Sequence, residues 1–525
     1  MSETLSPYSI STEKRRFVPI FQILFPDISK FNFYYILLSF RYKSKHYFYL
    51  NTCHEKPFVI YFIKQNLAFC LTVRLPGNHT AVSKYTTHSS TERMTYMALI
   101  TKKPRGTEDV LPRDSYRWQF LEDIFRDQAR AYGYREIRTP VFEHTELFER
   151  GVGDTTDVVQ KEMYTFTNKR GDSITLRPEG TAVAARALLE HGLFNDPLPI
   201  KNYYLTSCYR YEKPQAGRLR EFHQFGMECY GTKHPAADAE MIAAAKAIFD
   251  RLGIRGLRLE INSIGCPVCR AGYHKALTAY FTQYRDELCD DCKDRLGRNP
   301  MRLLDCKNEH DHAIAEKAPV MTDYLCDECR EHFDGVKAYL DAIGVAYTVN
   351  PRIVRGLDYY TKTVFEFISG DIGAQATVCG GGRDDGLIED LGGNPMPALG
   401  FAAGIERLLL TLDAQGIELP APAACDLYIA SMGEGAHLKA SALADVLRTA
   451  GLHAEFDVVG RGLRAQMKYA DKLGAKYSIV LGDNEIAEGT AKLKNMQTGE
   501  QQEISLAPDR FIDEFTQIKL KDDFS

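Results

Sequence analysis

Apolar residues recur at helical spacing in three stretches of this chain. Between residues 115 and 133 they follow a 3.6-residue period, which predicts an amphipathic helix that Gly133 ends. Residues 181–190, rich in Ala and Leu, predict a second helix, and residues 237–252 predict a third.

A second pattern, the alternation of apolar and polar residues, predicts strands. Residues 203–211 and 221–230 both alternate and flank a loop with turn-forming residues, so they predict an antiparallel hairpin. Residues 398–412 open with small residues and continue as a helix. Further strands are predicted over residues 134–138, 363–368 and 376–379.

Two changes in pattern indicate how the chain is divided. Residues 266–343 are mostly helical and highly charged and interrupt strand-like sequence, which indicates an insertion into a domain spanning residues 97–420. A Pro- and Ala-rich linker around residue 420 precedes a domain over residues 423–515. Strands alternate with helices there, which is typical of a small α/β fold, and the strands are predicted over residues 426–430, 453–458 and 477–481.

The first 96 residues differ in composition from the rest. They hold 19 Phe and Tyr, and 12 Lys and Arg against 5 Asp and Glu, whereas the whole chain carries a net charge of −5. An appended domain, a targeting segment and translated upstream sequence all remain open. Ordinary globular composition begins at Met97, so we expect Met97 to be the natural start and residues 1–96 not to be native.

The acidic balance of the whole chain, with a pI of about 6.3, disfavours non-specific coating of nucleic acid but permits a local basic surface. Arg461, Arg464, Lys468 and Lys472 gather near one predicted C-terminal helix, where a nucleic-acid contact or a solvated helix face fits them equally well. Because no run of 18 apolar residues occurs, we expect no membrane span.

Seven of the 13 cysteines lie between residues 266 and 329. Six of them form the pairs Cys266/Cys269, Cys289/Cys292 and Cys326/Cys329, and Cys306 stands alone. Without a secretory signal such pairs indicate metal ligands before disulfides, and we expect any Zn²⁺ at Cys289, Cys292, Cys326 and Cys329. Reduced thiols without a ligand remain the alternative.

Three arginines lie in settings suited to anionic groups. Arg355 precedes the adjacent phenols Tyr359 and Tyr360, Arg210 ends a predicted strand, and Arg407 follows a run of small residues. A guanidinium binds a phosphate or carboxylate bidentately and keeps its charge at any working pH. Glu179-Gly180-Thr181 adds a carboxylate and a hydroxyl that suit an amino or imidazole N–H, although Thr181 fits a helix N-cap equally well.

Together these motifs resemble the class II aminoacyl-tRNA synthetases. The stretch ending at Pro140 is similar to the first class motif, which builds the dimer interface, and residues 210–222 and 400–407 resemble the second and third. Residues 354–360 and 378–387 are similar to the two signatures of histidyl-tRNA synthetases. The resemblance covers about residues 100–506, including a family-like entry at residues 103–109.

This resemblance implies an α+β fold, with a class II catalytic domain on an antiparallel sheet, a helical insertion and a C-terminal α/β anticodon-binding domain. It implies a cytoplasmic homodimer that activates L-histidine with ATP and Mg²⁺ and transfers it to the 3′ end of histidine tRNA. Arg355 and Arg210 would be catalytic. Histidine would be bound by Glu179, Gly180, Thr181, Gln224, Glu228, Tyr359 and Tyr360, and ATP by Arg210, Glu212, Arg218, Phe222 and Arg407.

One departure and three rival functions qualify this interpretation. Asp384 stands where the family usually has a tyrosine of the amino-acid pocket. A non-catalytic synthetase-like regulatory subunit would usually lack the C-terminal domain and the catalytic arginines, which this chain retains. A class II enzyme for another amino acid would lack the run from Arg355 to Tyr360, and a pure RNA-binding protein would show no histidine-dependent pyrophosphate exchange.

Overall fold

The computed structural model describes residues 100–523 except 154–155, 307, 374–375 and 422–424, together with five strands between residues 37 and 86. These strands form one antiparallel sheet in chain order: β1 (Leu37–Tyr42), β2 (Lys45–Leu50), β3 (Phe58–Gln65), β4 (Ala68–Arg74) and β5 (Thr80–Thr86). The sequence pattern predicted none of them. Met97, the expected natural start, lies outside the described residues.

An eight-stranded sheet is the centre of the fold between residues 102 and 421, in the order β13-β12-β14-β15-β16-β11-β10-β6. Its strands are antiparallel except at the two edges, where β13 and β6 pair in parallel. The strands are β6 (Arg135–Glu136), β10 (Ile200–Tyr209), β11 (Glu221–Tyr230), β12 (Arg258–Ser263), β13 (Thr348–Val349), β14 (Thr361–Ile368), β15 (Thr377–Arg383) and β16 (Ala398–Gly404).

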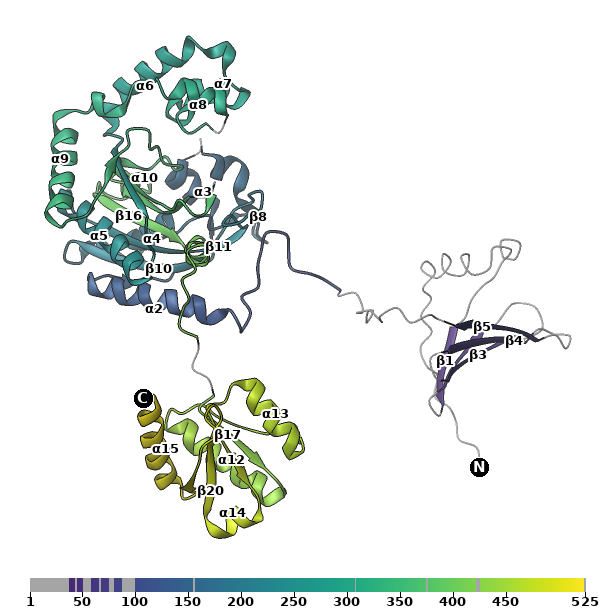
Figure 1. The fold of residues 1–525 in the computed structure, drawn as a ribbon. Coiled ribbons are helices and arrows are strands. Elements are labelled where there is room, and N and C mark those ends of the chain that lie inside the picture. The colour runs from purple at the N-terminus through teal and green to yellow at the C-terminus, as the bar shows by residue number, and fades with distance from the viewer. Residues whose placement is uncertain are drawn as a thin grey trace. The chain divides into compact units, whose positions relative to one another are not determined.

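Helices cover one face of this sheet and make the main core (Figure 1). They are α2 (Ser115–Ala131), α5 (Pro235–Arg251), α11 (Ile405–Ala414) and the second half of α9 (Asp327–Ala342). The side chains of strand β11 point alternately to this core and to the opposite face of the sheet. Phe225, Met227 and Cys229 enter the core, so the alternation of a strand turns Gln224 and Glu228 to the other side.

That opposite face carries α4 (Thr181–Glu190) and α10 (Leu387–Asp390), with a three-stranded sheet in the order β7-β9-β8 nearby in the chain. Its strands are β7 (Phe142–His144), β8 (Tyr164–Thr167) and β9 (Ser173–Leu176), and short turns connect them through α3 (Thr145–Phe148), η2 (Glu149–Gly153) and η3 (Val158–Glu162). The predicted helix over residues 181–190 is confirmed at both ends.

The predicted insertion is confirmed as a helical subdomain between β12 and β13, drawn at the top of Figure 1. It contains α6 (Pro267–Thr282), η5 (Arg285–Glu287), α7 (Asp290–Arg298), η6 (Pro300–Leu303), α8 (Glu309–Ala315), η7 (Met321–Tyr324) and α9. Its own core includes Tyr273, Leu277 and Phe281 together with several of the cysteines.

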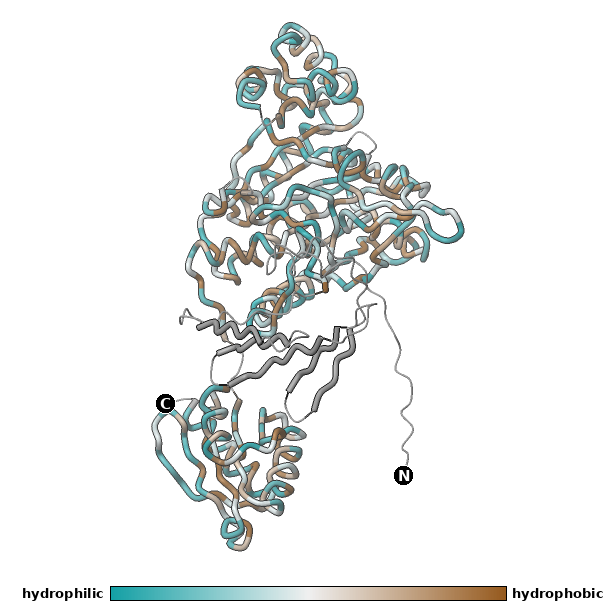
Figure 2. The backbone as a smooth tube through the Cα atoms, turned by 90° about the vertical axis from the view of Figure 1, so that its right-hand side faces the viewer, coloured by the Kyte–Doolittle hydropathy of each residue, from teal (hydrophilic) through white to brown (hydrophobic). Residues whose placement is uncertain are grey.

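The C-terminal domain is the predicted small α/β fold, with a five-stranded sheet in the order β18-β17-β19-β20-β21. Brown hydrophobic and teal hydrophilic residues alternate along its helices, as expected for elements that cover a sheet (Figure 2). Its elements are β17 (Leu427–Ser431), α12 (Glu434–Thr449), β18 (Ala454–Phe456), α13 (Leu463–Leu473), β19 (Tyr477–Leu481), α14 (Asp483–Glu488), β20 (Thr490–Asn495), β21 (Gln501–Ser505) and α15 (Pro508–Asp523).

Two details differ from the sequence-based expectation. The strand expected over residues 134–138 is only Arg135–Glu136. The small residues at 398–404 form strand β16 and not a helix start, because they pair with both β11 and β15. In the part of the chain that the structure describes, every helix is too short or too polar to cross a bilayer.

Candidate active site

The free face of β10 and β11 is shaped by one tyrosine and two glycines. The ring of Tyr204 lies against Gly180 and Gly226, and a Cβ built at either glycine would come within 2.3 Å and 2.2 Å of that ring, respectively. The Tyr204 hydroxyl donates to Glu228 over 3.2 Å. Sequence reasoning missed Tyr204, although the two glycines that leave room for it were a usable signal.

The Glu179-Gly180-Thr181 motif begins helix α4, and Glu179 is the residue that caps it. Its two carboxylate oxygens accept the backbone N–H groups of Thr181 (2.7 Å) and Ala182 (2.8 Å). Thr181 instead donates its hydroxyl proton to Glu228 over 2.7 Å. The expected alternative, an N-cap role for Thr181, is therefore wrong, since Gly180 occupies that position and Glu179 supplies the bonds.

Glu228 and Asp384 are two buried carboxylates with oxygens that lack a hydrogen-bond partner in the part of the chain that the structure describes. Glu228 Oε2 and both oxygens of Asp384 are buried without a hydrogen-bond partner among the described residues. Gly400 makes the room, because a Cβ there would come within 1.9 Å of Glu228 Oε2. Burial and the charge of Asp384 raise the pKa of Glu228 well above its usual value.

Asp384 itself is 1% exposed and follows β15. Burial, and next the charge of Asp385, raise the pKa of Asp384 to about 8. The charge of Glu179 acts on it in the same direction. Asp384 therefore interacts electrostatically with Glu179 and Glu228, two carboxylates that are expected to bind the amino acid. The resemblance to the family implies the same surroundings for this residue.

Arg355 lies directly on the backbone of the central sheet. A Cβ at Gly380 would be 2.5 Å from the Arg355 Nη2 atom, so only glycine leaves room for the guanidinium here. Arg355 pairs with Glu366, and its guanidinium carbon lies 5.3 Å from the centre of the Tyr360 ring. Burial opposes the charge, but Tyr360 and Glu366 outweigh it and raise the pKa of Arg355.

Tyr359 and Tyr360 form a wall beside Arg355. Their ring centres are 4.7 Å apart at an interplanar angle of 47°, and each residue is 7% exposed. Burial raises the pKa of both phenols, so both hydroxyls keep their protons at neutral pH and remain available as hydrogen-bond donors. A flat apolar wall with donors at its edge suits a small polar ring.

The other arginines converge on the same side of the sheet. Burial lowers the pKa of Arg407, and the positive charges of Arg218, Arg210 and Arg355 lower it further. Arg407 donates to the carbonyl oxygens of Gly217 (3.0 Å) and Thr377 (2.7 Å), which fixes its direction. The four guanidinium groups are thus close enough to interact electrostatically, and such a cluster of positive charge suits an anionic ligand.

The hairpin loop supplies the remaining predicted nucleotide residues. The Arg210 guanidinium lies 5.3 Å from the Phe222 ring centre and donates to the carbonyl of Pro178 over 2.9 Å. Glu212 pairs with Arg218 at 2.6 Å. Gln224 lies further along β11, where its amide oxygen accepts from the thiol of Cys208 at 3.4 Å. The structure thus brings the predicted ATP and histidine residues to one face.

Two further arginines near these residues have structural positions instead. Arg383 is fully buried and donates to Asp238 over 2.7 Å, which joins the end of β15 to α5. Arg177 donates to the carbonyl oxygens of Ser207 (2.7 Å) and Thr139 (2.9 Å), which joins the first class motif to β10. Neither was predicted as a site residue.

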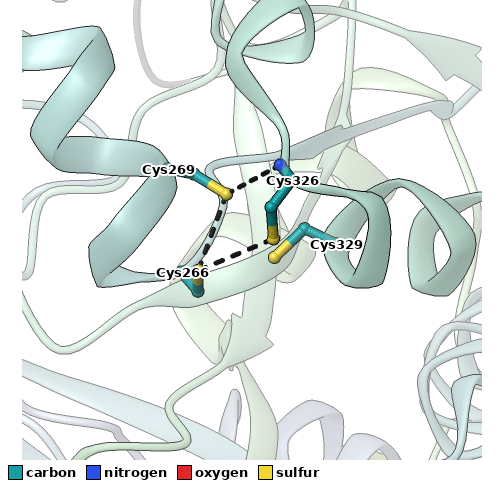
Figure 3. Close-up of side chains that lie close together, drawn as sticks. All are labelled: Cys266, Cys269, Cys326 and Cys329. Atoms are coloured by element: carbon teal, nitrogen blue, oxygen red, sulfur yellow. Dashed lines mark hydrogen bonds between the residues drawn. The ribbon is translucent and has the colours of Figure 1, made fainter.

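The four cysteines predicted as one metal site belong to two different clusters, so that grouping is wrong. Cys326 and Cys329 lie with Cys266 and Cys269 (Figure 3). Cys289 and Cys292 lie with Cys306 and Asp311. The spacing of the pairs along the chain could not reveal this, because the folding of the insertion decides which pairs meet.

The largely antiparallel sheet, the arginine that directly follows β10 in the hairpin and the second arginine at the start of α11 are together typical of a class II aminoacyl-tRNA synthetase. The comparisons with known proteins identify the family within that class. The family profile described as histidyl-tRNA synthetase matches residues 106–408, and the profile for an anticodon binding domain matches residues 426–517.

Similar proteins cover the same region. The chain is 58% identical over 406 residues to a histidine–tRNA ligase of Caldanaerobacter subterraneus, covering 77% of this chain and 97% of the relative. A Clostridium novyi histidine–tRNA ligase is 56% identical over 80% of this chain and 99% of its own length. The structure of apo S. aureus histidyl-tRNA synthetase matches with a TM-score of 0.68 and 42% identity, over 79% of this chain and all of that one. The chain belongs to the histidyl-tRNA synthetase family.

Proposed function

We propose that the chain is a histidine–tRNA ligase. It activates L-histidine with ATP, releases pyrophosphate, and transfers the histidyl group to the 3′ end of histidine tRNA. The observation that carries this function is the convergence of Arg210, Arg218, Arg355 and Arg407 beside the paired phenols. We also propose a cytoplasmic location, where tRNA and ATP are both available.

In the first step the histidine carboxylate attacks the α-phosphorus of ATP, and the bond to pyrophosphate breaks. The substrate supplies the nucleophile, so the protein provides position and positive charge. We assign Arg355 to the histidine carboxylate and the α-phosphate, Arg210 to the α-phosphate, and Arg407 to the distal phosphate. Mg²⁺ enters with ATP and is held chiefly by the phosphate oxygens.

We assign the base and ribose of ATP to the part of the site near the β10–β11 hairpin. We assign the adenine to the face of Phe222, which already stacks with the guanidinium of Arg210. Glu212 and Arg218 form an ion pair in the same loop and hold its position over the nucleotide. In the second step the terminal ribose hydroxyl of tRNA attacks the histidyl carbonyl, and AMP leaves.

The histidine side chain takes the carboxylate side of the site. Glu228 Oε2 is buried and has no donor among the described residues, so a substrate N–H would satisfy it. Thr181 and Tyr204 hold the other oxygen of Glu228 and fix its direction. Glu179, Gly180 and Gln224 border the same space, and Tyr359 and Tyr360 cover the flat face of the imidazole.

The test is histidine-dependent ATP–pyrophosphate exchange with Arg355→Ala. We expect the exchange rate to fall by a factor on the order of 10²–10⁴, which is the effect of removing a main electrostatic stabiliser. Arg355→Lys keeps the positive charge but not the planar guanidinium group. Its exchange rate should therefore lie between those of the parent and of Arg355→Ala. Arg258→Ala removes an exposed arginine from β12 of the same sheet and should leave exchange unchanged.

Two further readings define what would overturn the proposal. Exchange that is equal with and without Arg355 would refute the assigned role of the arginine. Exchange that depends on another of the twenty amino acids and not on histidine would refute the proposed substrate.

The family fold also leads us to propose a homodimer. We assign the C-terminal domain to the anticodon of the tRNA.

A further inference from the structure

Two pairs of cysteines meet at the base of the helical insertion. Cys266 and Cys269 open α6, Cys326 and Cys329 open α9, and their four sulfur atoms lie within 4.8 Å of one another (Figure 3). The two pairs are far apart in the chain, because Cys326 follows Cys266 by 60 residues. Two helix starts thus contribute two thiols each to one cluster.

The distances between the sulfur atoms match one particular ligand geometry. Cys266 Sγ lies 3.6 Å from Cys269 Sγ and 4.0 Å from Cys326 Sγ. Zinc–sulfur bonds of about 2.3 Å in a tetrahedron place the sulfurs about 3.8 Å apart. A disulfide would bring two sulfurs to about 2.05 Å. In a 4Fe–4S cluster each cysteine binds a different iron atom, so its sulfurs would stand further apart.

The surroundings of this cluster also favour bound thiolates. Both first cysteines occupy helix N-cap positions without making a side-chain cap bond, so their sulfurs are available as ligands. The backbone N–H of Cys326 donates to Cys269 Sγ over 3.1 Å, which is a bond that stabilises a ligating sulfur. Gly265, in a left-handed conformation with φ of 64°, turns the chain from β12 into Cys266.

A second cluster of the same kind lies further out in the insertion. It comprises Cys289 and Cys292 at the start of α7, with Cys306 and Asp311. The distance from Cys289 Sγ to Cys306 Sγ is 3.8 Å, and Cys306 Sγ lies 3.5 Å from Asp311 Oδ2. Tetrahedral zinc with bonds of about 2.3 Å to sulfur and about 2.1 Å to oxygen places such atoms about 3.6 to 3.8 Å apart.

We propose that the insertion binds two structural Zn²⁺ ions, one at Cys266, Cys269, Cys326 and Cys329, and one at Cys289, Cys292, Cys306 and Asp311. Each set offers four ligands, which fills a tetrahedral site and leaves no position for a substrate or a reactive water. The ions therefore serve the fold and take no part in the chemistry.

Each site is connected to the segment that carries Arg355. At the first site, Ile264 and Gly265 form backbone hydrogen bonds with Lys362, which lies on β14 two residues after Tyr360. Near the second site, Arg302 donates to the Gly356 carbonyl, and Asn299 donates to Asp358 over 3.3 Å. Arg302 precedes Cys306 by four residues. Zinc in the two sites would thus hold the insertion in the position from which it supports residues 356–362.

The experiment measures metal in the full chain, purified without chelators or an affinity resin that carries metal. Elemental analysis should find about two zinc ions per chain. Cys326→Ser should lose one, Cys306→Ser should lose the other, and the double variant should lose both. Cys425→Ser changes a buried free cysteine of the C-terminal domain and should keep both ions.

A second measurement reports the ligand set directly. Metal-free protein titrated with Co²⁺ should develop thiolate-to-cobalt charge-transfer bands and the visible bands of tetrahedral cobalt at two equivalents. In Cys306→Ser only the bands of the Cys₄ site should remain. Fewer than about 0.2 zinc per chain together with no cobalt bands would overturn the proposal, as would iron in place of zinc.

Two intermediate zinc contents would each refute part of the proposal. One zinc that Cys326→Ser removes and Cys306→Ser does not would refute the second site. One zinc that both substitutions remove would refute two independent ions. These readings do not depend on aminoacylation, so failure of the zinc proposal and failure of the proposed enzyme function are distinguishable.

Discussion

Asp384 stands where the resemblance leads us to expect a tyrosine of the amino-acid pocket. Two carboxylates, Asp384 and Glu228, are buried together, and the usual way to tolerate this is to keep protons on them. With a pKa of about 8, Asp384 is largely protonated at neutral pH. The pocket therefore need not hold a second full negative charge, and a protonated Asp384 can donate a hydrogen bond as the usual tyrosine would.

This raised pKa has a consequence for stability, because folded Asp384 keeps a proton that the unfolded chain releases near pH 4. The stability contribution of Asp384 is complete below about pH 4 and falls as the pH rises through about 8. Asp384→Asn cannot ionise, so we expect its melting temperature to exceed that of the parent on the order of 5 °C at pH 8, with a smaller difference at pH 5. Thermal unfolding measured across this pH range is the check.

The control is Asp286→Asn, which changes an exposed aspartate of the insertion and should follow the parent at every pH. If Asp384→Asn and the parent melt with parallel pH profiles, Asp384 does not hold its proton in the folded protein. A variant that melts lower than the parent at pH 8 would lead to the same conclusion.

Helix α13 is the element with the clearest link to tRNA. Arg464, Lys468 and Lys472 recur at a spacing of four residues, so they share one side of the helix, and all three are exposed. Arg461 is different, because it pairs with Asp457 at 2.8 Å and stacks with Tyr469. We assign the three exposed cations to phosphate groups of the tRNA.

Substituting Arg464, Lys468 and Lys472 together by Ala should weaken tRNA binding and flatten its dependence on salt. Each lost phosphate contact lowers the slope of log K against log salt by about 0.7 to 0.9. Histidine-dependent pyrophosphate exchange should stay unchanged, since it needs no tRNA. Filter binding at several salt concentrations measures the slope, and Lys492→Ala on β20 is the control. An unchanged slope would rule out this side of α13 as the contact.

For helices and strands, the sequence predicted their positions better than it predicted which of them lie side by side. The 3.6-residue period located α2, and alternation located β10 and β11, because both patterns reflect which side of an element is buried. Small residues at 398–404 carry no such period, and their strand is fixed by neighbours far away in the chain.

The same distinction holds within the site. Family motifs gave the arginines and the tyrosine pair, whereas three facts needed coordinates: Glu179 caps α4, Tyr204 fills the space beside two glycines, and the cysteines group across the insertion. Each of these depends on which segments meet. Spacing along the chain does not contain that information.

At the scale of the whole molecule, a group of exposed apolar side chains leads us to expect a second subunit. Val141, Phe142 and Phe166 lie on or beside the small sheet β7-β9-β8 and are 39%, 58% and 48% exposed. Exposed apolar side chains that are grouped on one surface, in contrast to single ones, are typical of a region that is covered in an assembly. Val141 and Phe142 directly follow Pro140, at the end of the stretch similar to the first class motif, which the resemblance leads us to expect at a dimer interface.

We therefore expect the purified chain to be a homodimer and Phe142→Glu to shift it toward monomer, because a buried charge at the interface has no partner. Light scattering coupled to size exclusion, at micromolar protein concentration, measures the mass. Phe194→Glu alters an aromatic residue of comparable exposure, 41%, in η4 (Leu193–Asn195), and should leave the dimer intact. Arg177 ties the first class motif to β10, which carries the hairpin of Arg210, so dissociation should also lower pyrophosphate exchange. A parent chain that is monomeric at this concentration yet fully active would contradict both the interface and its coupling to the site.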